Sequence, residues 1–102
     1  MDYERVLAGK EKALPIYKAI AAALENPRSF PDLLEPIYRE AMTLDDETLD
    51  RFRFSLMRLQ LYADVHRNED LEQAMHIKYV AQVIEKVVFG SLIMEPAEPL
   101  AD

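Results

Sequence analysis

One stretch of the chain, residues 44–67, constrains the fold more than any other. On a helical wheel of about 100° per residue, its apolar positions form two stripes on opposite sides. A surface helix of a small bundle needs only one such stripe, so this helix is predicted to be covered on both sides, by helices of the same chain or by another chain. The inner stripe consists of Leu49, Phe52, Leu56, Leu59, Ala63 and His66, and the outer stripe of Phe54, Met57, Leu61 and Val65.

The start of this central helix carries three independent signals. Asp45 is a favourable N-cap, because its carboxylate can accept from free backbone N–H groups of the first turn. Asp46 and Glu47 then lie at the positive end of the helix dipole. Leu44 and Leu49 occupy the two positions of a hydrophobic staple. We therefore predict that the helix begins at Asp45.

The N-terminal part of the chain is rich in proline. The apolar phase of residues 2–25 runs through Pro15, which favours one helix kinked near Leu14 over two separate helices. A second helix, short and bent by Pro36, is predicted over about 30–42.

The C-terminal part predicts one more helix. Cationic groups at 66–67 suit the end of the central helix. Asn68 is then the predicted N-cap of a helix over about 69–90, and Gly90 is its predicted C-cap. No Gly or Pro marks a turn there, so a single continuous helix over 46–90 is the alternative.

Length and composition place these helices in one domain. The chain has 102 residues, of which 50% are hydrophobic, with only 2 Gly and no Cys. Few turn residues argue against a β fold, and the absence of Cys excludes a disulfide framework. The predicted fold class is therefore all-α: a small antiparallel bundle of about four helices, the second short and proline-bent. We expect a single domain over 1–94 and a flexible acidic tail over 95–102.

The net charge of the chain limits the kinds of partner that it is expected to bind. A net charge of −7 disfavours direct binding to nucleic acid or to an anionic membrane, and it permits a basic partner. The N-terminus lacks a signal-peptide pattern, and the apolar run at 87–94 is too short to cross a bilayer. We expect a cytoplasmic protein.

The sequence contains few residues in patterns typical of a catalytic site. His66 and His76 are its two histidines, and Glu72 stands four residues before His76, which is the wrong spacing for the Glu-x-x-His pair of di-iron bundles. The acidic residues 45–47 lack the alternating oxygen ligands and the glycine of a calcium loop. We predict no catalytic, cofactor or metal site, and a protein that is not an enzyme.

The predicted function is non-catalytic protein–protein interaction, through a homodimer formed by the outer face of the central helix. Arg58 and Tyr62 flank the outer stripe, and both residue types are enriched at interfaces. The predicted interface residues are therefore Phe54, Met57, Arg58, Leu61, Tyr62 and Val65.

Two other functions stay open. The first is an acidic inhibitor that occupies the nucleic-acid site of a basic partner, with its carboxylates on one face. The second is a small enzyme or ligand carrier with a pocket in the bundle core around His66. The carboxylates that would form the acidic face are Asp45, Asp46, Asp50, Asp64, Glu69 and Asp70.

Overall fold

A computed structural model of the protein describes residues 3–8 and 15–93, and within them it contains helices and no strand. The all-α fold class is confirmed. In chain order the elements are α1 (Tyr3–Ala8), α2 (Pro15–Glu25), a short 3-10 helix η1 (Pro27–Ser29), α3 (Phe30–Ala41), α4 (Asp46–His66) and α5 (Leu71–Ile93).

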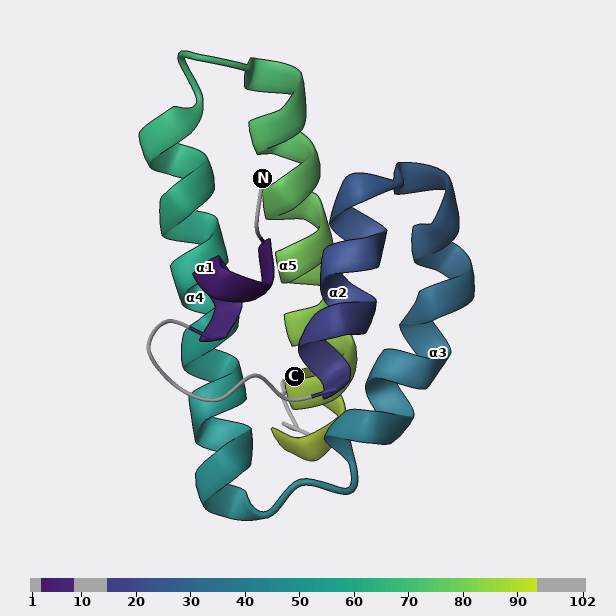
Figure 1. The fold of residues 1–102 in the computed structure, drawn as a ribbon. Helices are drawn as coiled ribbons and strands as arrows, with labels where there is room; N and C mark the ends of the chain where they lie inside the picture. The colour runs from purple at the N-terminus through teal and green to yellow at the C-terminus, as the bar shows by residue number, and fades with distance from the viewer. Residues whose placement is uncertain (1–2, 9–14, 94–102) are drawn as a thin grey trace, which may run out of the picture.

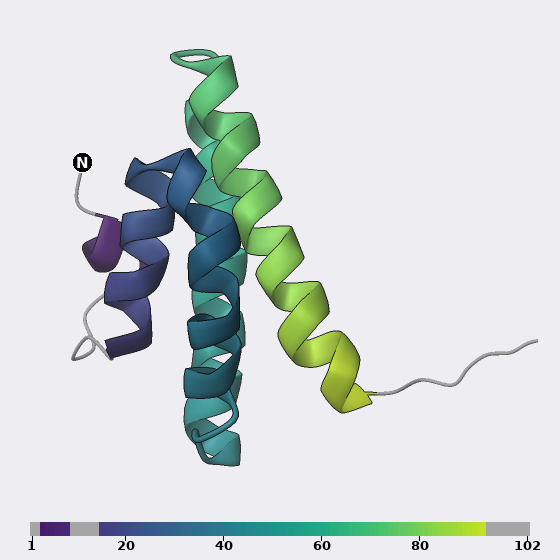
Figure 2. The same cartoon turned by 90° about the vertical axis from the view of Figure 1, so that its right-hand side faces the viewer.

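The helices form two antiparallel pairs. α4 and α5 run side by side in opposite directions, and α2 and α3 do the same (Figure 1). α5 lies between α4 and the α2–α3 pair, since it contacts α2 and α3 as well as α4. The short α1 crosses α4 and also contacts α2. α4 therefore lies at the edge of the bundle, and α5 leans away from it toward its C-terminal end (Figure 2).

The core is built from one face of each α-helix. The inner stripe of α4 supplies Phe52, Leu56 and Leu59, which are fully buried. Each such side chain stabilises the fold by roughly 1.5–3 kcal/mol relative to an exposed one. The buried hydroxyl of Ser55 is satisfied, because it lies 2.8 Å from the Tyr17 hydroxyl and donates to the carbonyl of Arg51 at 3.0 Å.

The prediction of one kinked helix over 2–25 is wrong. α1 and α2 contact each other, which a single kinked helix cannot do with its own two halves. Pro15 is the first residue of α2, where a missing backbone N–H has no consequence, so it starts a helix instead of bending one. The predicted kink at Leu14 and the predicted tail over 95–102 lie outside the described residues. α3 covers nearly the predicted range of 30–42 and has Pro36 inside it, and the predicted bend at Pro36 stays a prediction.

The break between α4 and α5 is confirmed, and the continuous-helix alternative is wrong. The predicted N-cap is also wrong. Asp70, not Asn68, accepts a hydrogen bond from the backbone N–H of Gln73, at 3.1 Å, so α5 begins two residues later than predicted. Gly90 is not a C-cap, because α5 continues past it to Ile93.

Candidate interaction surface

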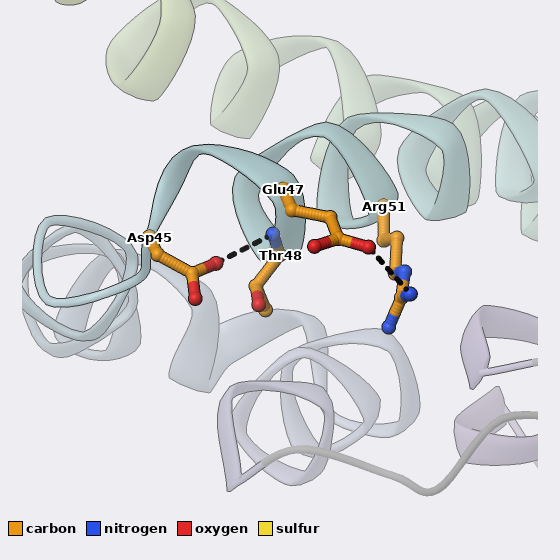
Figure 3. Close-up of polar contacts among 4 residues, drawn as sticks. All are labelled: Asp45, Glu47, Thr48 and Arg51. Atoms are coloured by element: carbon orange, nitrogen blue, oxygen red, sulfur yellow. Dashed lines mark hydrogen bonds and ion pairs between the residues drawn. The ribbon is translucent and has the colours of Figure 1, made fainter.

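The first turn of α4 has the N-cap that the sequence predicts. Asp45 Oδ1 accepts from the backbone N–H of Thr48 at 2.8 Å, which confirms the predicted N-cap (Figure 3). Hydrogen bonding to Thr48 lowers the pKa of the Asp45 carboxyl below its usual 3.8. One turn on, Arg51 Nη2 lies 3.0 Å from Glu47 Oε2 across the exposed surface of the helix. From this start onward, the spacing of the apolar residues determines which of them share a side of the helix.

The outer stripe faces away from the core. Its four side chains are exposed by 65% at Phe54, 48% at Met57, 63% at Leu61 and 73% at Val65. The structure therefore brings these predicted residues together on one open face of α4. An exposed apolar cluster of this kind is uncommon on a soluble monomer unless it binds something.

The two predicted flanking residues lie on the side of the stripe that faces α1. Arg58 Nη1 donates to the backbone carbonyl of Leu7 at 2.8 Å, so its guanidinium ties α1 to α4. Tyr62 is half-buried, and its ring lies 4.3 Å from that of His66, measured between centroids. Both residues therefore have structural contacts within the chain, and they border the outer stripe.

Charged residues border the stripe on the side that faces α5. Asp64 Oδ1 accepts from Lys78 Nζ at 2.9 Å, and Arg53 Nε lies 3.9 Å from Glu85 Oε2. The Arg53 guanidinium also lies over the Phe89 ring, 5.2 Å from its centroid. All four charged side chains remain partly exposed, so these pairs contribute little to stability and stay available to a further charge.

Apolar side chains continue onto α5 beyond this charged border. A shallow depression of about 490 Å³ is lined by Met57 and Leu61 together with the charged residues. A smaller one, of about 90 Å³, is lined by Leu71 and Met75. These two α5 residues are exposed, and the sequence reasoning missed them. Their spacing of four, out of phase with the buried residues of α5 such as Ile77, was the available signal.

Both histidines contact other groups of the chain. His66 Nδ1 lies 3.0 Å from Glu69 Oε1, and His76 Nε2 lies 3.2 Å from the carbonyl of Ala23. Among residues 3–8 and 15–93, no group of three or more His, Asp or Glu side chains could hold a metal ion. His66 does not line either depression of the α4–α5 face.

The carboxylates suggested for an acidic face fall into two groups. Asp45, Asp46 and Asp50 lie at the start of α4, whereas Asp64 lies near its end, and the 21 residues of α4 span about 30 Å. Phe54, Met57 and Leu61 of the outer stripe lie between these two groups along the helix.

Comparison of the chain with protein-family models, with curated proteins and with solved structures found no match. The surface is therefore interpreted from its own residues. Among the helices that the structure describes, none is both long and apolar enough to span a membrane.

Proposed function

We propose that the protein is a non-catalytic interaction module that forms a homodimer through the outer stripe of α4. One observation carries the proposal: Phe54, Met57, Leu61 and Val65 form an apolar stripe along the helix face opposite the core, and all four are exposed. The two described helices that contact α4 most, α1 and α5, pack on the other side of α4 or at the borders of the stripe. Since residues 3–8 and 15–93 leave the stripe exposed, the proposal takes a second molecule as its cover.

The energetics of association favour this use of the stripe. Burying a large apolar side chain is worth roughly 1.5–3 kcal/mol, so completing the burial of one stripe against another gives on the order of 10 kcal/mol. The loss of translational and rotational freedom costs about 4–15 kcal/mol. The two magnitudes are comparable, so we expect a dimer of moderate affinity whose stability depends on contacts at the edges of the stripe.

The test places charges in the centre of the stripe. Met57→Glu combined with Leu61→Glu would bury two carboxylates per copy in an apolar contact, so the double variant should be monomeric. We expect a mass of twice 11.8 kDa for the unmodified chain and of 11.8 kDa for the variant, measured by sedimentation equilibrium. Both positions are exposed, so helical circular dichroism should be unchanged.

The matched control is Lys18→Gln combined with Ala22→Glu. It changes the net charge by the same amount, at two exposed positions on α2. This variant should keep the dimer mass. A monomeric unmodified chain, or a Met57/Leu61 variant that keeps the dimer mass, would contradict the proposal.

A further inference from the structure

The outer stripe is almost symmetric about the level of Leu59. Reversing the direction of α4 about this level brings Phe54 to the level of 64–65 and Met57 to that of Leu61. The apolar side chains of a reversed second copy therefore fall opposite apolar side chains of the first. A two-fold axis at Leu59, perpendicular to α4, generates this arrangement with the same residues on both copies.

The charged border gives the same orientation independently. A two-fold axis perpendicular to α4 keeps the α5-facing sides of both copies on one side of the interface. Arg53 of one copy then lies at the level of Asp64 of the second copy, because the two positions are nearly equidistant from Leu59. The pairs that exist within each chain, Arg53 with Glu85 and Asp64 with Lys78, join into a row of alternating negative and positive charges.

A parallel arrangement lacks this complementarity. It places each helix segment at the level of the same segment in the other copy. The arginine-rich segment, with Arg51, Arg53 and Arg58, then lies beside its own copy, and like charges at an interface are unfavourable. The acidic first turns, with Asp46 and Asp50, are likewise brought together.

We infer that the second copy packs with its α4 antiparallel to the first, centred at Leu59, with Arg53 of each copy against Asp64 of the other. This inference rests on the proposed homodimer and adds its orientation. The occupant of the outer stripe is the same stripe of the second copy, and two symmetric charge contacts fix the direction in which the helices run.

Cysteine cross-linking reports the orientation directly, because the chain has no cysteine of its own. Phe54→Cys and Val65→Cys are made separately, one of them with a mass tag, and oxidised alone and as an equal mixture. A disulfide requires Cα atoms about 4.4–6.8 Å apart. The two positions are about 16 Å apart along the helix, at ~1.5 Å per residue. The antiparallel dimer should cross-link in the mixture, with little product from either variant alone.

Each outcome separates the orientation from the proposed function. Cross-linking of each variant with itself would mean a parallel dimer, which overturns this inference and leaves the proposed homodimer standing. If the variants keep the dimer mass but do not cross-link in any combination, the axis is not at Leu59 and the inference fails. If the unmodified chain is monomeric, the proposed function fails first.

A second experiment leaves the apolar stripe intact, in case the cysteine variants dissociate. Arg53→Asp and Asp64→Arg each place like charges at both contacts, so each should raise the dissociation constant about tenfold or more. An equal mixture restores opposite charges in the heterodimer and should recover the affinity of the unmodified chain within a few-fold. A mixture that binds no more tightly than either variant alone would overturn the inference.

Discussion

The two faces of α4 carry the same kinds of side chain and have opposite surroundings. Phe52 and Leu59 on the inner stripe are completely buried, whereas Phe54 and Leu61 on the outer stripe are about two-thirds exposed. The difference arises from the position of α4 at the edge of the bundle, where the neighbouring helices pack on one side only. Hydrophobicity alone therefore does not decide burial within one chain, and an apolar face without a neighbour is a reason to look for a second molecule.

The largest expected difference between the faces comes from two phenylalanines two positions apart. Phe52→Ala should lower the free energy of unfolding by about 3–5 kcal/mol, because it leaves a cavity in the core. Phe54→Ala removes a mostly exposed ring and should change it by less than about 0.5 kcal/mol in dilute solution. Urea denaturation followed by circular dichroism measures both values.

The dependence of stability on protein concentration distinguishes the two faces further. If the outer stripe binds a second copy, the unmodified chain should become more stable as concentration rises, and Phe54→Ala should lose part of that gain. Equal destabilisation by the two variants in dilute solution would mean that Phe54 is covered within the monomer. Should Phe52→Ala fail to fold, Phe52→Leu against Phe54→Leu makes the same comparison with a milder change.

An intermediate effect is expected from the buried hydroxyl on the inner side of α4. Ser55→Ala leaves the Tyr17 hydroxyl buried without its acceptor and should cost about 1–3 kcal/mol. Tyr17→Phe should cost less, because Ser55 Oγ still donates to the carbonyl of Arg51. The double variant should be less destabilised than the sum of the two single variants in a double-mutant cycle. Additive effects would show that the two hydroxyls do not interact.

The central helix could be predicted from the sequence because its signals are local. The cap at Asp45, the end near His66 and the two stripes all follow from residues within a few positions of one another. The phase of the helix also predicts that Phe54 and Val65 lie on one face together, and the structure places them there. Their role as an interface stays a prediction, since it depends on a second molecule.

The wrong predictions concern helix starts and ends at which the local sequence permits more than one structure. Asn68 and Asp70 are both good N-caps, and tertiary packing against α4 decides in favour of Asp70. Gly90 permits a helix end without requiring one, so the packing of α5 carries the helix past it. Pro15 can bend a helix or start one, and only the contact between α1 and α2 reveals which.

The smallest expected effect concerns the start of α4, on which both faces depend equally. The carboxylate of Asp45 accepts from Thr48, and its pKa in the folded chain lies below the usual 3.8. A lowered folded-state pKa adds stability that is present above the unfolded value and is lost as the pH falls through the folded value. Asp45→Asn keeps an acceptor but removes the charge, so it should lower the urea midpoint slightly at pH 7. The deficit should shrink as the pH falls through the folded-state pKa of Asp45.

Asp46→Asn is the matched control, because it removes a charge from the same helix end and does not accept the capping bond from Thr48. Its deficit should be smaller than that of Asp45→Asn at pH 7, since only the interaction with the helix dipole is lost. Neither substitution should alter the dimer mass, because both side chains lie at the start of α4, outside the outer stripe. A deficit at Asp45 that persists unchanged at pH 2 would mean that the charge of the carboxylate does not contribute to the cap.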